Sequence, residues 1–542
     1  MMRVRFVFRG LALLVCTLLA QAAGAQQFNW VQTRPFSPSG QFPVTRALAA
    51  DAQGGVALAR PAGPISFWSG PGLSAVEVLH YAAGGPAPAF ARLLRGTGEA
   101  LALHYDARGD LLLLGRYADS LQFPAGPVLR NPKVAPFLAK FSPDGQLQWA
   151  HDLTTVLGAG ISEAQSLATD PAGNIFLGYT RHTPAAMPHT EVARLSPQLR
   201  GSPQVLLRQE RVTAIRSLHR DAAGNLLVAG ACVELGATFG GQAVTVPNFS
   251  YVAYLARYSA AGQLRWVRLL EDGTCPHAQV AADGQGGYYY GVDLMMTSPI
   301  QLGPFRVQAL SADDYLLARL DSSGSWQWVR QLPASSGSLR LGDTGREQFL
   351  GADALGNVYL AGTCDGTIDW GGSVGTTAGF YDAAVVSYDR AGNLRWVRLA
   401  GGPDADGANS LAVTPAGEVY LAGFAQNTAA FGTLPAGAPG TAYSFLAQLG
   451  GSLLPNREAH SSAWQLYPNP AAAAGSVHIR LPQAPSAPVG YQLRDALGRV
   501  VRTGSWQGTS FELPTRGLRP GAYLLTVQLP QELPRTQRLL LQ

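Results

Sequence analysis

The feature that most constrains this chain is a repeat that occurs seven times between Leu48 and Gly423. Each copy has a short alternating stretch, a turn built on Asp-x-x-Gly-Asn or a close variant, and a second apolar stretch. Clear copies read SLATDPAGNIFLGYT from Ser166, SLHRDAAGNLLVAG from Ser217 and FLGADALGNVYLAG from Phe349. Self-similarity at a spacing of about 50–70 residues indicates stacked supersecondary units, none of which can bury its apolar face alone.

A second motif follows the first within each repeat, after a loop of variable length. Examples are FLAKFSPDGQLQWAHDL from Phe137, YLARYSAAGQLRWVRLL from Tyr254 and AVVSYDRAGNLRWVRLA from Ala384. Two alternating runs around a glycine-containing turn predict a β-hairpin. A tryptophan recurs at one position of the last run, where a place in the core between repeats is commoner than a sugar-stacking role. These residues are Trp149, Trp266, Trp328 and Trp396.

Two hairpins per repeat give four antiparallel strands, and a four-stranded sheet repeated radially is a propeller blade. Closing the ring leaves few exposed strand edges. We therefore predict an all-β chain that forms an about seven-bladed β-propeller of four-stranded antiparallel blades; six blades, eight blades and an open array are the alternatives. The residues that mark the first turn of each repeat are Asp51, Asp106, Asp170, Asp221, Asp283, Asp353 and Thr414.

Composition narrows the class of partner. Charged residues make up only 14% of the 542 residues, whereas hydrophobic residues reach 47%, so a large core is available and wholesale disorder is excluded. The formal charge is +5, and three of the arginines lie in the first 25 residues, which leaves +2 for the rest. A charge so close to zero argues against capture of nucleic acid.

The ends of the chain indicate its destination. Residues 1–25 combine a basic start, the apolar run LALLVCTLLA and a small-residue site at Ala23-Gly24-Ala25, which is typical of a secretory signal peptide. A mature chain would start near Gln26, with the propeller repeats over residues 26–450. No other stretch approaches the roughly 20 apolar residues of a membrane helix, so we expect no transmembrane segment.

The composition changes after Gly450. A linker of small and polar residues covers 451–463, and from Trp464 alternating runs are separated by Pro, Gly and Asn turns. This pattern over residues 464–542 predicts a small C-terminal β-sandwich.

Ordered motifs in this tail resemble the C-terminal sorting domain of the bacterial type IX secretion system, of the Por type. The blocks are YPNP, DALGRV and LRPGAY, and their residues are Tyr467, Pro468, Asn469, Pro470, Asp495, Gly498, Arg499, Gly521 and Tyr523. The repeats from Ala47 to Gly450 resemble the β-propeller repeat family of bacterial surface proteins. The resemblance implies passage through the periplasm, recognition of the tail by the type IX machinery, and a secreted or outer-surface destination.

Signs of catalysis or metal binding are weak. The repeated Asp is expected to cap its own turn rather than bind calcium, because later acidic ligands are missing. Asp404, Asp406 and Asn409 form the best candidate ion loop, but solvated turn residues are the favoured interpretation, so no cofactor is predicted and calcium is the alternative. The G-x-S-x-G motif of a nucleophile elbow is matched by Gly371-Gly372-Ser373-Val374-Gly375. This segment is expected in a glycine-rich loop, without the strand-turn-helix setting that the motif requires.

Three cysteines remain after the leader, Cys232, Cys275 and Cys364. Cys232 and Cys364 occupy the same repeat position two blades apart, so they should not meet. We hypothesise a disulfide between Cys232 and Cys275, with Cys364 free; three free thiols are the alternative.

Two classes of function follow. The favoured one is a non-enzymatic exported binding protein whose variable loops, such as Val233–Asn248 and Thr363–Gly379, contact a polysaccharide or protein. The alternative is an exported glycan-active enzyme with its site at the propeller channel.

We predict that the tail is cleaved off between Gly450 and Trp464, because the linker there is rich in small and polar residues. Mass-spectrometric mapping of both termini of the protein from the cell surface and the medium checks this prediction. An intact tail on the exported protein would contradict it.

Overall fold

The computed structural model describes residues 26–36, 47–62, 73–183, 186–246, 252–270, 278–294, 299–308, 314–331, 337–341, 348–371, 373–450, 465–473, 475–481, 485, 487–495, 499–528 and 535–542. The chain divides into two compact units, Met1–Leu453 and Leu454–Gln542. The predicted leader (1–25) and linker (451–463) lie outside the described residues. Within the described parts, no helix is long and apolar enough to cross a membrane.

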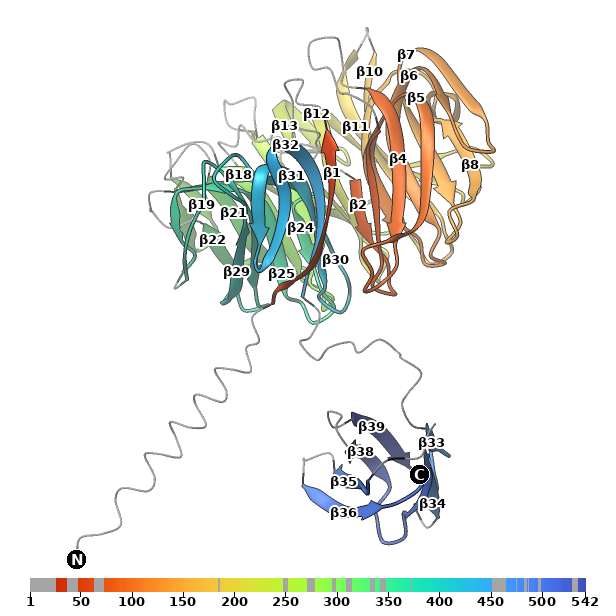
Figure 1. Cartoon of the computed structure of the whole chain (residues 1–542). Coiled ribbons are helices and arrows are strands. Elements are labelled where there is room, and N and C mark those ends of the chain that lie inside the picture. The colour runs from red at the N-terminus through yellow and green to blue at the C-terminus, as the bar shows by residue number, and fades with distance from the viewer. Residues whose placement is uncertain are drawn as a thin grey trace, which may run out of the picture. The chain divides into compact units, whose positions relative to one another are not determined.

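The strands described in the first unit group into seven antiparallel blades, each four strands across. Figure 1 shows these sheets arranged side by side in the first unit. Blades 1 and 2 consist of β2 (Ala47–Ala50), β3 (Val56–Pro61), β4 (Ser74–Tyr81), β5 (Pro88–Tyr105), β6 (Leu111–Gln122), β7 (Val128–Phe141) and β8 (Leu147–Asp152). Blades 3 and 4 consist of β9 (Ile161–Thr169), β10 (Ile175–Thr183), β11 (Ala186–Leu195), β12 (Gln204–Arg220), β13 (Leu226–Phe239), β15 (Val252–Tyr258) and β16 (Leu264–Leu270).

The remaining three blades are separate sheets. Blade 5 consists of β17 (Ala278–Ala282), β18 (Tyr288–Leu294), β21 (Asp314–Leu320) and β22 (Trp326–Gln331). Blade 6 consists of β23 (Ser338–Arg340) and β24 (Leu350–Ala352) on one side of β25 (Val358–Asp365), followed by β28 (Asp382–Tyr388) and β29 (Leu394–Ala400). Blade 7 consists of β30 (Gly407–Val413), β31 (Val419–Phe431), β32 (Leu434–Leu449) and β1 (Phe28–Phe36).

Two long strands are each shared by two blades. In β5, residues 88–94 and Gly98 pair with β4, and residues 95–105 pair with β6. In β12, residues 204–210 pair with β11 and residues 209–220 pair with β13. The outer strand of one blade therefore continues directly into the first strand of the next, which explains why the sequence shows no crossover loop at these places.

The N-terminal strand closes the ring. Strand β1 pairs antiparallel with β32 and supplies the outer strand of blade 7, which Figure 1 shows as a red strand among the blue ones. The two ends of the propeller are joined there, because Gly450 N–H donates to the Gln27 carbonyl at 3.1 Å and Asn29 Nδ2 donates to the Gly450 carbonyl at 2.8 Å. Sequence analysis did not assign β1, since it precedes the first repeat.

A Trp-x-Arg pair on the outer strand fastens each of several blades to the next one. In blade 5, Trp328 Nε1 donates to the Arg390 carbonyl and Arg330 Nε donates to the Gly392 carbonyl, both in a turn of blade 6. Trp266 and Arg268 of blade 4 bind Ser322 and Gly324 of blade 5 in the same way. The indoles of Trp266 and Trp328 are buried, as the sequence predicts.

The same contact recurs at both ends of the repeat array in altered form. In blade 1, Phe90 stands in place of the tryptophan, and Arg92 Nε donates to the Gly145 carbonyl of blade 2 at 2.6 Å. In blade 6, Arg398 Nε donates at 2.6 Å to the carbonyl of Gln26. Gln26 leads into β1, so the closing strand takes the place of the missing turn of blade 7.

The variable loops are folded hairpins in five blades, and their predicted role in contacting a ligand stays a prediction. Strands β6–β7, β13–β14 (Gln242–Ala243), β19–β20 (Ile300–Leu302 and Phe305–Val307), β26–β27 (Thr367–Asp369 and Val374–Thr376) and β31–β32 form these hairpins. Each hairpin contributes a buried side chain to the apolar cluster shared with the preceding blade. These side chains are Phe123, Phe239, Leu302, Trp370 and Phe431.

The C-terminal unit has two sheets that enclose one apolar core. One sheet contains β33 (Gln465–Tyr467), β34 (Ser476–Arg480) and β37 (Ser510–Pro514). The other contains β36 (Val500–Trp506), β35 (Val489–Asp495), β38 (Gly521–Gln528) and β39 (Arg535–Leu541). Leu493, Leu513 and Leu525 are fully buried between them. The predicted all-β class, with about seven propeller blades and a small C-terminal sandwich, is confirmed.

Removal of Phe28–Phe36 is expected to destabilise the propeller by several kcal/mol. The deletion leaves blade 7 with three strands, and burial of the Phe28 side chain alone is worth about 1.5–3 kcal/mol. Thermal unfolding of the full chain and of the deletion variant measures the loss, and a synthetic peptide of residues 26–36 should restore part of it. A variant that ends at residue 453 is the control, and an unchanged melting temperature after the N-terminal deletion would contradict the prediction.

Candidate functional site

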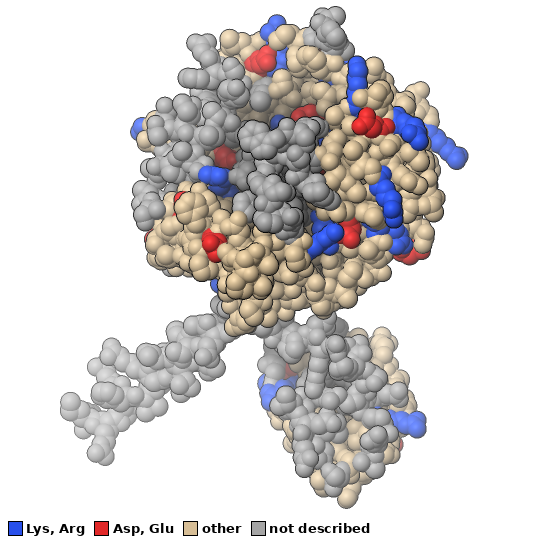
Figure 2. Space-filling view, turned by 45° about the horizontal axis from the view of Figure 1, so that its top comes forward, with Lys and Arg blue, Asp and Glu red and all other residues tan. Residues whose placement is uncertain are grey.

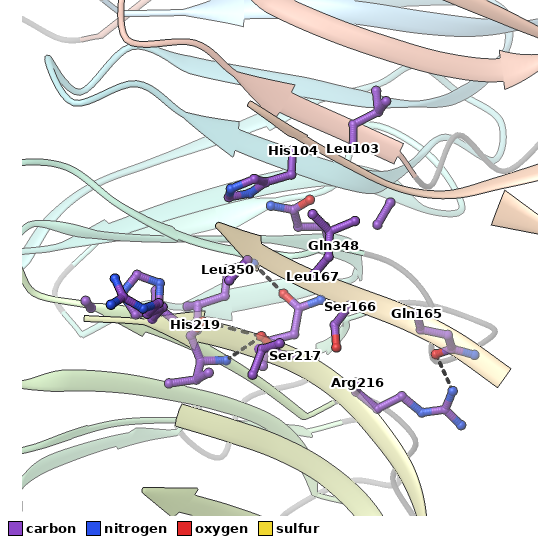
Figure 3. A pocket seen from close by; sticks show the side chains of 18 of the residues that line it. Leu103, His104, Gln165, Ser166, Leu167, Arg216, Ser217, His219, Gln348 and Leu350 are labelled. Atoms are coloured by element: carbon purple, nitrogen blue, oxygen red, sulfur yellow. Dashed lines mark hydrogen bonds between the residues drawn. The ribbon is translucent and has the colours of Figure 1, made fainter. Parts of the chain in front are cut away.

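The first strands of the blades surround a central cavity. Residues of β5, β9, β12, β17 and the segment leading into β24 line a space of about 360 Å³ (Figure 3). Its lining combines leucine and alanine side chains with His104, Gln165, Ser166, Ser217 and Gln348. The volume falls in the range of roughly 300–1,000 Å³ that is usual for ligand pockets.

A wider cavity of about 680 Å³ lies at the end of the ring where the Asp-x-x-Gly turns are found. It shares His219, Ala282 and Ala352 with the first cavity, so the two adjoin. Its other lining is mostly alanine and glycine of the turns, together with Asp51, Asp106, Asp221 and Asp353. We call the two cavities together the funnel and the wider one its mouth.

Most polar groups of the inner cavity bind the neighbouring blade. Between blades 2 and 3, His104 Nε2 lies 3.0 Å from Thr169 Oγ1. The guanidinium of Arg216 in blade 4 donates to Gln165 in blade 3, as Figure 3 shows. Further links join Ser217 to Val280, Gln279 Oε1 to the Phe349 and Leu350 N–H groups, and the Gln348 carbonyl to Leu411 N–H. These bonds make the wall a rigid surface with few free polar groups.

Two histidines of the wall are uncharged at neutral pH. Burial lowers the pKa of His104 to about 4, and the neighbouring His219 lowers it further against the opposing effect of Asp106. Burial lowers the pKa of His219 as well, with Asp221 opposing. Sequence analysis missed this pair, although each histidine stands two residues before a repeated turn aspartate.

The repeated turn aspartates are structural caps. Asp51 Oδ1 accepts the N–H groups of Gln53 and Gly55 at 2.8 and 2.7 Å, and the Asp of the other turns accepts corresponding bonds. Thr414 Oγ1 replaces the carboxylate in blade 7. The glycine of the turn is required because its φ is positive, for example 84° at Gly173.

The second carboxylate oxygen of these residues is also engaged in several blades. Asp106 Oδ2 binds Lys140 Nζ at 2.7 Å, and Asp353 Oδ2 accepts from Tyr359 Oη at 2.8 Å. Burial opposes ionisation of Asp106, but the bonds from Lys140 and from backbone N–H groups hold its pKa below the ordinary value. The carboxylate oxygens of Asp106 and Asp353 at the mouth are therefore already bonded.

The predicted ion loop lies in the crossover between blades 6 and 7. Asp406 Oδ2 accepts Gly402 N–H at 2.6 Å, its Oδ1 accepts Gln426 N–H at 2.9 Å, and Asp404 Oδ2 accepts from Asn427 Nδ2 at 2.8 Å. Asn409 is buried in β30. Among the described residues, no three His, Cys, Asp or Glu side chains are grouped so that they could hold a metal ion.

Asp382, which sequence analysis did not single out, joins this acidic crossover. A Cβ atom at Gly401 would lie 2.3 Å from Asp382 Oδ1 and 3.0 Å from Asp406 Oδ2, so the two carboxylates face the same point. Asp382 Oδ1 is buried without a hydrogen-bond partner in the described structure. Burial raises the pKa of Asp406 to about 6, and the charges of Asp382 and Asp404 add to the rise.

The nucleophile-elbow match and Cys364 occupy structural positions in blade 6. Gly371–Gly375 spans the turn of the β26–β27 hairpin, which is not a strand-turn-helix. Cys364 is a free, buried thiol whose pKa is raised to about 12 by burial and by the charges of Asp382 and Asp365. Cys275 and the side chain of Cys232 lie outside the described residues, so the Cys232–Cys275 disulfide remains a prediction.

The sorting-motif residues hold turns of the C-terminal unit. Asn469 Oδ1 accepts Leu540 N–H at 2.9 Å, which ties the YPNP block of Tyr467–Pro470 to the last strand. Asp495 accepts bonds from the N–H and guanidinium groups of Arg499. Tyr523 Oη donates to the Arg519 carbonyl at 2.8 Å, and Gly521 has a φ of 149°. Gly498 lies outside the described residues.

Comparisons with known proteins agree with this division. Residues 465–542 match the family described as secretion system C-terminal sorting domain. No curated protein matches the chain. Solved structures with some likeness include a puromycin hydrolase mutant (13% identity, TM-score 0.43), of which 54% is covered by 73% of this chain, so the chain spans about half of that hydrolase.

Two further solved structures with some likeness to the chain come from named bacteria. PorZ, an essential surface component of the type IX secretion system of Porphyromonas gingivalis, has 11% identity and a TM-score of 0.15, with 94% of this chain and 100% of PorZ covered. A DUF4221 family member from Bacteroides vulgatus has 8% identity and a TM-score of 0.32, with 62% and 92% covered. Similarity at these levels carries no information about activity or ligand.

The chain is thus a repetitive all-β protein with a propeller and a separate C-terminal unit. Its last 78 residues are a secretion system C-terminal sorting domain, of the type IX kind that the motifs resemble, and this domain marks the chain for export.

Replacement of Asp382 by asparagine is expected to stabilise the protein by about 1 kcal/mol at pH 7.5. Because the folded pKa of Asp406 is raised, the stability linked to its proton is fully present below the unfolded pKa of about 4 and is lost as the pH rises through about 6. The variant removes one charge of the pair, so its advantage over the wild type should shrink towards pH 5.

Denaturant unfolding at pH 5.0 and 7.5 measures this difference. Asp389→Asn is the matched control, because its carboxylate is exposed and caps Asn393, so that variant should lose stability at pH 7.5. A loss of stability at pH 7.5 in Asp382→Asn would contradict the prediction.

Proposed function

We propose that the protein is an exported, non-enzymatic binding protein, secreted or held at the outer cell surface, and that its ligand enters the funnel through the mouth. The observation that carries this proposal is the pair of adjoining cavities, the inner one lined by polar side chains from five blades. Export follows from the sorting domain, which implies handling by the type IX secretion machinery. The ligand is a polysaccharide or a protein segment narrow enough to enter.

A binding role fits the wall better than an enzymatic one. The two wall histidines are held as neutral side chains, and the carboxylates at the mouth already accept hydrogen bonds from their own turns. Catalysis of glycan cleavage requires two carboxylic groups that are free to act as acid and as base or nucleophile. The described mouth carboxylates are engaged as caps, so they are poorly placed for proton transfer.

The surface charge supports a ligand recognised by shape rather than by long-range attraction. On the face shown in Figure 2, the described Lys and Arg side chains are interspersed with Asp and Glu. Arg34 and Arg60 both bind Glu77, and Arg116 binds Glu99, so several of the described cations are paired. A surface of this kind does not steer a strongly charged polymer.

Arrays of glycans and matrix proteins probed with the full chain test the proposal. A ligand of the funnel should bind Gln348→Ala about tenfold more weakly, because the cavity loses a side chain whose backbone, not its carboxamide, bonds the next blade. Gln204→Ala, at an exposed position of β12, is the control and should bind as the wild type does.

If Gln348→Ala and Gln204→Ala both bind the ligand as the wild type does, the ligand binds outside the funnel. That result would contradict the proposal. Release of shorter products from a bound glycan would favour the enzymatic alternative instead.

A further inference from the structure

The inner cavity of the funnel carries positive charge without a matching carboxylate, and the inference drawn from it rests on the proposed function. Its described lining contains two charged side chains, Arg216 and Arg220, and no Asp or Glu. Arg216 Nη1 donates to Gln165 and lies 3.4 Å from Glu163 Oε2, so its charge is partly offset. The Arg220 guanidinium stacks over the Phe176 ring at 5.3 Å and forms no ion pair or hydrogen bond with a described residue.

The terminal nitrogens of these arginines are the atoms that a ligand can meet. The Nε atoms of Arg216 and Arg220 are buried, so they are closed to a ligand. Nη2 of Arg216 and both Nη atoms of Arg220 also lack a partner among the described residues, but they are not fully buried. A half-buried guanidinium without a counter-ion costs free energy, which a carboxylate can recover through two parallel hydrogen bonds.

Uncharged hydrogen-bonding groups line the same cavity, as Figure 3 shows. The ring nitrogens of His219 and the carboxamide of Gln348 have no partner among the described residues and are not fully buried. Because burial lowers the pKa of His219, its imidazole is neutral at pH 7 and offers one donor and one acceptor. These groups can bond the hydroxyl groups of a ligand without adding negative charge.

The mouth does not exclude an anion. Two of its four lining aspartates have cations beside them, because Lys140 Nζ lies 2.7 Å from Asp106 Oδ2 and Arg257 Nη2 lies 3.7 Å from Asp221 Oδ2. An acidic group that passes the mouth reaches a cavity whose described charged lining is entirely positive. The attraction acts inside the cavity only, so it requires no long-range steering of a charged polymer.

The remaining lining favours an acidic sugar over an acidic peptide. Leu103, Leu167 and Leu350 line the cavity, and the C–H faces of a sugar ring can pack on them. A peptide segment brings backbone N–H groups that need acceptors, whereas the guanidinium groups of the wall only donate. N–H groups left without a partner would weaken its binding. The volume of about 360 Å³ suits a short oligosaccharide segment.

We propose that the inner cavity binds an acidic oligosaccharide segment and that the Arg220 guanidinium holds its carboxylate, with His219 and Gln348 among the partners of its hydroxyl groups. An acidic peptide and an uncharged glycan are outcomes that the test separates from this one.

Matched oligosaccharides that differ in the acidic group test the proposal. One pair is digalacturonate and its methyl ester, and the other is cellobiouronate and cellobiose. Calorimetric titration of the full chain should show at least about tenfold tighter binding of the acidic member in one pair or both. Because an ion pair forms, that binding should weaken as the salt concentration rises from about 50 to about 500 mM. A tetraglutamate peptide should bind more weakly than the acidic sugar.

Three variants connect the measurement to the cavity. Arg220→Met removes the charge and keeps a long side chain against Phe176, so it should reduce the preference for the acidic member to about threefold or less. Arg220→Lys keeps the charge and should preserve more of the preference than Arg220→Met does. Arg200→Met, at an exposed turn position outside the lining, is the matched control and should keep the wild-type preference. Circular dichroism and the melting temperature verify that the variants are folded.

The outcomes distinguish this inference from the proposed function. Equal or tighter binding of the neutral member in both pairs, binding of neither acidic sugar, a peptide that binds at least as tightly, or an unchanged preference in Arg220→Met overturns the inference. If an array ligand without an acidic group is still weakened by Gln348→Ala, the funnel remains the binding site and only the ligand class is wrong. If no array ligand responds to Gln348→Ala, the proposed function fails with it.

Discussion

The pairing of β1 with β32 is the interaction on which the propeller depends. A chain that builds blades in sequence order ends with a blade that lacks its outer strand, and here the N-terminal strand supplies it. Gln26 also replaces a turn carbonyl that Arg398 requires. Ring closure is therefore a contact between residues more than 370 positions apart, and every blade interface relies on the curvature that closure imposes.

Two sets of hydrogen bonds transmit that constraint around the ring. At the periphery, Arg268 and Arg330 reach turn carbonyls of the following blade. Near the axis, side chains such as His104 and Gln279 bond the neighbouring inner strand. Most polar groups of the wall thus bond a neighbouring blade. A ligand can bind only the few polar groups that are not used in this way. This explains why the described lining of a conspicuous cavity offers few unbonded polar groups.

Much of the fold could be predicted from local patterns. The Asp-x-x-Gly turn identified each first hairpin, because its carboxylate cap and its glycine with positive φ are formed within five residues. The tryptophans predicted inter-blade contacts, and Trp328 makes one. Blade 1 was harder to recognise, since Phe90 replaces tryptophan while Arg92 keeps the contact. The folded hairpins escaped prediction because their anchors, such as Phe123 and Trp370, fit no common spacing.

The sequence alone determined the repeat, the turns and the sorting motif, because each of these is encoded by residues a few positions apart. Asn469 and Asp495, for example, cap turns of the C-terminal unit that the motif already marks. The tertiary structure decided which residues meet across blades: the neutral His104 and His219 along the funnel, the carboxylates of Asp382 and Asp406 in one crossover, and β1 in the last blade. These contacts depend on burial and on the closed ring, neither of which is present in any single segment of the chain.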